Sequence, residues 1–217
     1  MTDTAPAAPL PDGQALAALV AGKLCHDFIS PAGAISSGLD LLKDPTAQDM
    51  RDDAMGLIES SARKMVALVA FARVAFGAST SAERFSGAEL GELVAGLAEG
   101  GRAALEWRVD AGDYSKAEAR ALVNLAWLTL AALPSGGTAT VAARRADGLE
   151  IAGVAEGARA RLKLEAAAGL EGRPLTEGLP GQWIQPYWLW LTAREAGGAL
   201  EVEAGEDRVA LTVRMPN

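Results

Sequence analysis

The amino-acid sequence predicts two structural parts: an N-terminal helical hairpin that pairs into a dimeric four-helix bundle, and a C-terminal α+β sandwich. Apolar residues recur every three or four positions through residues 13–76, the pattern of amphipathic helices. After a small polar stretch, short segments with helix-capping signals alternate with short strand-like segments. A chain of 217 residues is long enough for one large or two small domains, each with its own core.

The first predicted helix covers residues 13–43. Pro31 lies inside it, where a proline removes one helical hydrogen bond and bends the axis. The apolar stripe that should face a neighbouring helix consists of Val20, Leu24, Phe28, Pro31, Ile35, Leu39 and Leu42.

A second helix should start at Asp44 as N-cap and Pro45 as first residue, and should end at Gly77. One hairpin cannot bury both apolar stripes, so two hairpins in a dimeric four-helix bundle are the expected completion. The predicted organisation is a disordered tail at 1–12, a hairpin at 13–77, a linker at 78–85 and an α+β domain at 86–217.

The C-terminal domain opens with the capping box Ser86–Glu89, and a second box, Ser115–Glu118, starts another helix. These features predict helices on one face of a mostly antiparallel sheet. The helix that opens at the first box should end near Glu99, the helix that opens at the second box should end near Leu133, and a third helix should cover 183–196. The expected strands are 104–110, 138–145, 149–155, an edge strand at 158–165, 199–204 and 208–214.

Composition excludes several classes of function. The net charge of −8 leaves no basic stripe for nucleic acid. A single cysteine precludes an internal disulfide and fits a reducing compartment. The first residues lack the pattern of a signal peptide, and no apolar run reaches the ~20 residues of a membrane span. We therefore expect a soluble, cytoplasmic protein.

His26 is the only histidine, and helix phase indicates which way it points. At 3.6 residues per turn it lies roughly 160° from both Leu24 and Phe28, hence on the solvent face. The small residues of that face suit a platform that another protein can approach closely, although tight packing of a neighbouring domain would also explain them. The expected partner-binding residues on this helix are Leu19, Gly22, Lys23, Ser30, Gly33 and Ser37, together with Pro31.

An exposed, neutral imidazole is a competent nucleophile, and the adjacent Asp27 is placed to hold a proton on one ring nitrogen. Lys23 either approaches the reacting group or is a solvated surface charge. One histidine and one cysteine offer no credible zinc site, and Gly-x-Ser-x-Gly is absent.

The motif His26-Asp27-x-x-x-Pro31, on the first helix of a hairpin followed by an α+β domain, resembles the phosphoacceptor box of sensor histidine kinases. Residues 121–138 resemble the helix and strand of the kinase nucleotide-binding domain, so the resemblance implies an ATPase-like α/β sandwich. Its nucleotide boxes are degenerate: Leu128 replaces the magnesium-binding asparagine, Asn124 is one turn too early, and residues 182–186 are bulky where a glycine-rich loop is needed.

This combination, with the blocks at 24–42 and 71–77, is similar to the ChpT family of alphaproteobacterial histidine phosphotransferases. The resemblance implies a homodimer that relays phosphoryl groups through His26 without binding ATP or a metal of its own. It implies a donor receiver domain of a CckA-like hybrid kinase and CtrA-like and CpdR-like response regulators as acceptors, each receiver bringing its own Mg²⁺.

The alternating Arg159, Arg161 and Lys163 would share one side of the expected edge strand and face an acidic receiver. The alternative is a basic edge that only discourages aggregation. Two other functions stay open: a residual kinase, which would need to bind nucleotide, and a non-catalytic dimeric scaffold, which would not need His26.

Overall fold

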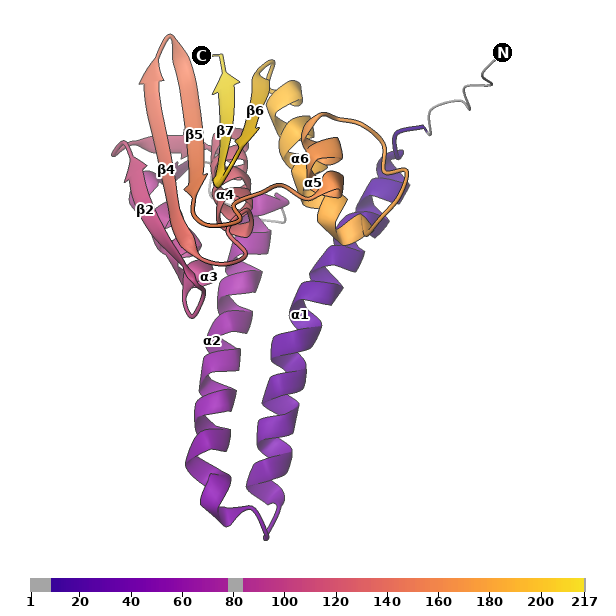
Figure 1. The fold of residues 1–217 in the computed structure, drawn as a ribbon, viewed down its shortest axis with the longest axis vertical. Helices are drawn as coiled ribbons and strands as arrows, with labels where there is room; N and C mark the ends of the chain where they lie inside the picture. The colour runs from indigo at the N-terminus through magenta and orange to yellow at the C-terminus, as the bar shows by residue number, and fades with distance from the viewer. Residues whose placement is uncertain (1–8, 78–83, 217) are drawn as a thin grey trace.

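The computed structural model describes residues 9–77 and 84–216 and has the two predicted parts. Helices α1 (Gly13–Lys43) and α2 (Arg51–Ala75) form a long hairpin that projects from a compact α+β body (Figure 1). Asp12 caps α1 by accepting a hydrogen bond from the Ala15 N–H at 2.8 Å. The predicted tail lies mostly in residues 1–8, and the predicted linker mostly in 78–83, both outside the described residues.

The hairpin turn differs from the prediction. Asp44 ends α1 instead of capping the second helix, because its carboxylate accepts from the backbone N–H and hydroxyl of Thr46 within the turn. A short 3₁₀ helix, η1 (Gln48–Met50), then leads into α2, which begins later than the Asp44-Pro45 signal indicated. The end of α2 is as predicted, with Gly77 at a φ of +71°.

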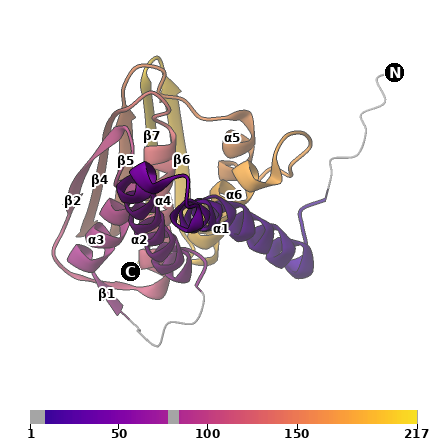
Figure 2. The same cartoon turned by 90° about the horizontal axis from the view of Figure 1, so that it is seen from below.

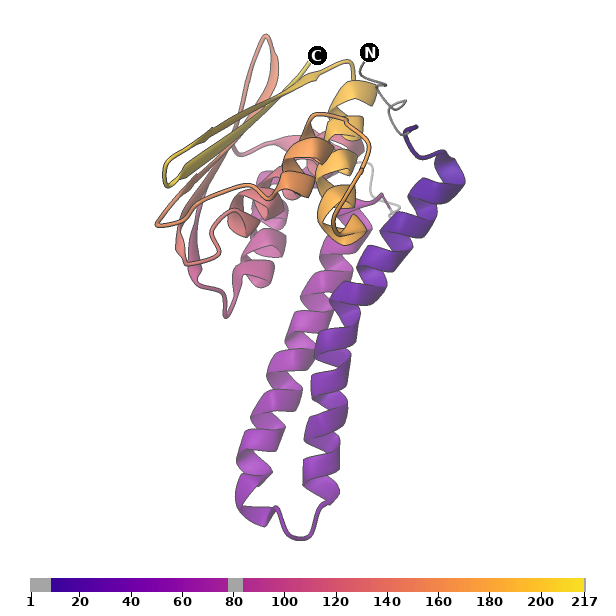
Figure 3. The ribbon, with the colours of Figure 1, turned by 45° about the vertical axis from the view of Figure 1, so that its right-hand side comes forward.

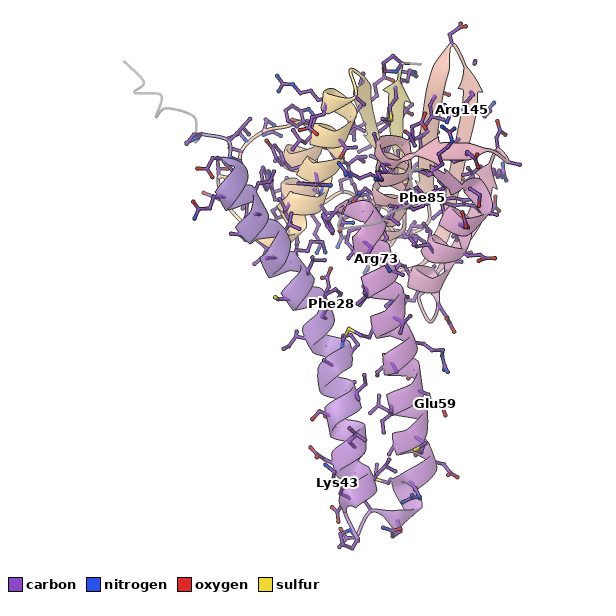
Figure 4. All side chains as sticks on the ribbon, turned by 180° about the vertical axis from the view of Figure 1, so that it is seen from behind. Phe28, Lys43, Glu59, Arg73, Phe85 and Arg145 are labelled. Atoms are coloured by element: carbon purple, nitrogen blue, oxygen red, sulfur yellow. The ribbon has the colours of Figure 1, made fainter. Side chains whose placement is uncertain are left out.

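The axis of α1 changes direction near the predicted point. Phe28 marks the level above which α1 leans away from α2 (Figure 4). Pro31 lies inside the helix one turn below that level, so the observed bend agrees with the expected loss of a hydrogen bond. The bend carries the N-terminal half of α1 towards the body.

The body contains one five-stranded sheet with the order β2-β4-β5-β7-β6. β2 and β4 are parallel and the other neighbours antiparallel. Helices α3, α4 and α6 cover one face of this sheet, as the end-on and side views show (Figures 2 and 3). The strands are β2 (Ala103–Val109), β4 (Gly137–Ala146), β5 (Gly148–Glu156), β6 (Ala199–Gly205) and β7 (Arg208–Met215), and the helices are α3 (Gly87–Ala98), α4 (Lys116–Ala131) and α6 (Pro180–Glu195).

Both predicted capping boxes are present. The Ser86 and Ser115 side chains accept from the backbone N–H three residues later, and Glu89 and Glu118 return the interaction to the cap backbone. Hydrogen bonds from the backbone and side chain of Ser86 lower the pKa of Glu89. Local sequence thus determines where α3 and α4 begin.

The predicted edge strand at 158–165 is wrong. The segment after β5 finds no free position beside that strand, because β5 already pairs with β4 on one side and β7 on the other. The chain leaves β5 through a turn in which Arg159 has a φ of +68° and its backbone N–H donates to Asp207 Oδ1. It then forms the short helix α5 (Leu164–Leu170). A small two-stranded pair, β1 (Arg84–Ser86) with β3 (Asp113–Ser115), was not predicted.

The hairpin and body are joined by buried polar contacts at the end of α2. The carbonyl oxygen of Ala75 accepts hydrogen bonds from Asn124 Nδ2 at 2.8 Å and from Trp188 Nε1 at 3.0 Å. Gln185 Nε2 donates to Asn124 Oδ1 at 3.1 Å. Earlier in α2, Lys64 Nζ donates to the carbonyl oxygen of Leu97 on α3. The body is therefore held against α2 by specific bonds.

A separate apolar cluster joins the N-terminal half of α1 to α6. Its centre is formed by the buried residues Trp183, Ile184 and Tyr187, and Trp183 stacks on Tyr187 with ring centroids 4.3 Å apart. Leu16 and Leu19 of α1 pack against this cluster. The bent half of α1 thereby becomes part of the body. Across the described ranges 9–77 and 84–216, no helix is long and apolar enough to cross a membrane.

Candidate functional site

The site is built around His26, which lies on α1 where the helix passes the body. Its side chain is 86% exposed, as helix phase predicted. Leu24 and Phe28, two residues before and after it, are partly buried, so the ring of His26 lies on the opposite, outer side of the helix. A partner protein can therefore reach the imidazole directly.

Asp27 uses its two carboxylate oxygens for two different partners. Oδ1 lies 3.4 Å from His26 Nδ1, and Oδ2 accepts from Lys23 Nζ at 2.6 Å. A proton on Nδ1 points towards this carboxylate and leaves the lone pair on Nε2 for attack. The predicted pairing of Asp27 with the histidine is consistent with this geometry.

Lys23 differs from the prediction of an exposed residue, because its side chain is only 5% exposed. Besides the ion pair with Asp27, its ammonium lies 4.7 Å from the ring centroid of Trp127 on α4. The helix-phase argument considered only the stripe that faces α2. It missed that the body covers a second face of α1, and Lys23 lies on that face.

A cavity of about 540 Å³ lies between α1 and the body, with His26 and Asp27 on its wall. Trp127 and Leu128 of α4, Leu162 and the N-terminal end of α6 contribute to its apolar lining. Arg161 and Lys163 also line it and bring positive charge to the cavity that His26 lines. The cavity joins an exposed histidine, apolar surface and basic side chains in one place.

The other predicted partner-binding residues on α1 divide into two groups. Gly22 is exposed and lines the cavity, whereas Leu19 lines it while packing against the Trp183 cluster. Ser30, Gly33 and Ser37 are exposed further along the helix, as predicted. Pro31 is a correction: it is buried, because it belongs to the stripe that faces α2.

The three basic residues do not share one face. Arg161 and Lys163 line the cavity, while Arg159 is held in its turn near Asp207 and is absent from that lining. The alternation in sequence suggested a common side only because a strand was assumed. Two of the three predicted residues therefore line the same cavity as His26.

Asn124 and Leu128, which stand in the degenerate nucleotide box of α4, are buried in the protein interior. Asn124 is fully buried and its side-chain amide is bonded to Ala75, Arg120 and Gln185. Leu128 is also buried. Within the part of the chain that the structure describes, no group of three or more His, Cys, Asp or Glu side chains is placed to hold a metal ion.

Trp127 was not identified from the sequence as a site residue. It is the half-buried member of an otherwise buried run on α4, so its position resembles ordinary core. No local motif connects it to His26, because the contact with Lys23 joins residues far apart in the chain. The sequence signal for this site residue was limited to a tryptophan next to buried positions on that helix.

An exposed histidine on a helical hairpin, beside a carboxylate and joined to an α+β body, is the arrangement expected of the histidine phosphotransferase class. Residues 87–208 match the family model described as the histidine phosphotransferase C-terminal domain. The chain is 30% identical over 199 residues to the protein phosphotransferase ChpT of Brucella abortus (strain 2308), covering 91% of this chain and 94% of that protein. It also matches a solved bacterial phosphotransferase with a TM-score of 0.84 and 27% identity, covering 95% of this chain and 99% of the other. The chain belongs to the family of ChpT-type histidine phosphotransferases.

Proposed function

We propose that this protein carries a phosphoryl group on His26 between the aspartate of a hybrid-kinase receiver domain and the aspartate of a response regulator. The observation that carries the proposal is the exposed imidazole, paired with Asp27, on the wall of a cavity formed with the body. Membership in the phosphotransferase family supports the same reaction class.

In the proposed reaction, Nε2 of His26 attacks the phosphorus of an aspartyl phosphate. The N–P bond forms as the bond from phosphorus to the donor carboxylate oxygen breaks, and the free carboxylate leaves. The ring acquires positive charge, which the nearby carboxylate of Asp27 stabilises through the Nδ1 proton. A second receiver aspartate reverses these steps and takes the phosphoryl group.

The chain needs neither ATP nor a metal ion of its own for this reaction, because Mg²⁺ is supplied by the receiver. Buried Leu128 and the structural use of Asn124 support the loss of nucleotide chemistry. Incubation with labelled ATP and Mg²⁺ should leave His26 unlabelled. ATP-dependent labelling would instead support the residual-kinase alternative.

The cavity side of the body is the proposed docking surface for receivers, whose active faces are acidic. Arg161 and Lys163 supply opposite charge. Leu164, the next residue in the chain, is 88% exposed and offers apolar contact. A receiver of a CckA-like kinase and CtrA-like or CpdR-like regulators in the cytoplasm are the expected partners. Replacing Arg161 and Lys163 with alanine should slow transfer, while the matched Arg159→Ala should not; equal rates in all three proteins would remove this surface from the interface.

The hairpin is the proposed homodimer interface, and two copies would complete a four-helix bundle. It is left unpaired below the body and carries most of the exposed large apolar residues of the described ranges (Figure 3). These are Ile29, Leu39, Met50, Met55, Leu57, Val66 and Val69.

The exposed face of α2 offers a direct test of the dimer. Met55, Val66 and Val69 fall within about 60° of one another at 3.6 residues per turn. Val66→Glu should shift the mass measured by light scattering from dimer towards monomer, and Ser60→Glu, which adds the same charge on another face, should not. A wild-type monomer at micromolar concentration would contradict the bundle.

The decisive functional experiment compares the wild type with His26→Ala after incubation with a phosphorylated receiver domain. Label on the wild type alone, stable to base and labile to acid, supports transfer through His26. Receiver binding by both proteins without label on either would favour the scaffold alternative.

A further inference from the structure

We propose that Trp127, a residue of the degenerate body, is a positioning residue for His26 and acts through Lys23 and Asp27. This inference rests on the proposed role of His26 as phosphoryl carrier. It gives the body a function that does not require nucleotide: holding the histidine and its carboxylate in reactive orientation.

The first step is the burial of Lys23. An ammonium group with 5% of its side chain exposed has lost most of its hydration and needs compensating partners. It has two, the Asp27 carboxylate at 2.6 Å and the face of the Trp127 ring at 4.7 Å from the centroid. A cation over a tryptophan face gains more as water is excluded, so the indole favours Lys23 in this one position.

The second step connects Lys23 to the histidine. Lys23 engages Oδ2 of Asp27, and the carboxylate then presents Oδ1 to His26 Nδ1 at 3.4 Å. Asp27 is 26% exposed, so without the lysine its carboxylate can rotate towards water. The ion pair thus selects the carboxylate rotamer that keeps a proton on Nδ1 and the Nε2 lone pair available.

The third step is the rigidity of the element that carries Trp127. On α4 the indole lies one turn after Asn124, which is bonded to the end of α2 through Ala75. A buried run on either side of Trp127 packs α4 into the core. The junction between hairpin and body therefore fixes the position of the indole. Through its contact with Lys23, the indole in turn fixes the position of the Lys23 side chain on α1.

The single histidine allows a direct test. Imidazole nitrogen chemical shifts report the tautomer of one residue without overlap, in the full-length protein and without any partner. In the wild type we expect the Nδ1–H tautomer to dominate. Trp127→Leu and Lys23→Met should shift the signals towards the mixture of an unrestrained imidazole, and Trp127→Phe, which keeps an aromatic face, should recover part of the wild-type signal.

Transfer kinetics provide the second readout. With a saturating phosphorylated receiver, Trp127→Leu should lower kcat by about threefold to tenfold, the size of a partly desolvated cation–π contact, with little change in KM. Trp107→Leu on β2 is the matched control. It removes an indole of the same domain far from Lys23 and should change neither the tautomer nor kcat, even if it lowers stability.

The inference is overturned if folded Trp127→Leu and Lys23→Met keep the wild-type tautomer, or if Trp127→Phe behaves like Trp127→Leu. A raised KM with an unchanged tautomer would make Trp127 a docking residue and also overturn it. If wild-type His26 accepts no phosphoryl group, the proposed function fails, and the nitrogen shifts still decide whether Trp127 positions the ring.

Discussion

Replacing Asn124 with leucine should destabilise the junction between hairpin and body. The side chain is fully buried, and its amide donates to Ala75 and Arg120 at 2.8 Å each and accepts from Gln185 at 3.1 Å. Leucine has a similar size, so the main change is the loss of these three hydrogen bonds. The substitution also removes the direct bond from α4 to α2.

The expected loss in the free energy of unfolding depends on which hydrogen bonds the former partners of Asn124 retain. The Ala75 carbonyl retains its bond from Trp188 Nε1 at 3.0 Å, so it is not left unpaired. Gln185 Nε2 loses the acceptor Asn124 Oδ1 while buried, and its Oε1 has no partner among the described residues. Net hydrogen bonds of about 1 kcal/mol each and an orphaned donor of about 1–3 kcal/mol predict a loss of about 2–4 kcal/mol in the free energy of unfolding.

Urea unfolding followed by tryptophan fluorescence, at one fixed protein concentration, measures this loss. Adding Gln185→Leu to Asn124→Leu removes the orphaned amide, so the double variant should be more stable than the sum of the two single effects predicts. A cost below about 0.5 kcal/mol for Asn124→Leu, or strict additivity of the two substitutions, would refute the reasoning.

Two further predictions concern the hairpin and the second capping box. A Cβ at Gly38 would lie 2.7 Å from Ile58 Cγ1, so Gly38→Val should lower the free energy of unfolding, measured in urea, by about 1–3 kcal/mol. Gly33→Ala, on the open side of the same helix, should instead raise it by up to about 1 kcal/mol. Equal effects of the two substitutions would contradict the close helix contact at Gly38. Burial raises the pKa of Glu118, but hydrogen bonds from Arg145 and the second capping box outweigh this and lower it from its ordinary value of 4.5. The stability that Glu118 contributes is therefore present above about pH 4.5 and is lost as the pH falls through the depressed value, so Glu118→Gln should flatten that acid limb of a Tm-against-pH profile; an unchanged limb would show that the carboxylate contributes nothing there.

Much of the fold follows from local signals. The capping boxes specify the starts of α3 and α4, and apolar spacing specifies α1, because each signal acts within one or two turns of helix. Asp44 misled the prediction since an aspartate before a proline suits both an N-cap and a tight turn. Its bonds to Thr46 show which of the two the hairpin uses.

The site was predictable only where it depends on α1 alone. Phase calculated from one stripe placed His26 correctly at the surface but also placed Lys23 there. The burial of Lys23 comes from Trp127, which no spacing rule connects to it. Similarly, Arg159, Arg161 and Lys163 alternate as a strand would, whereas both positions beside the preceding strand β5 are occupied by β4 and β7.

The packing of α1 against α6 affects the order in which the site can form during synthesis. His26 lies near the start of the chain, but the cluster of Trp183, Ile184 and Tyr187 that holds the neighbouring turn of α1 lies near its end. Contacts between such distant segments form only after a long loop has closed. A nascent or truncated chain that lacks α6 therefore carries His26 without the α6 side of its cavity.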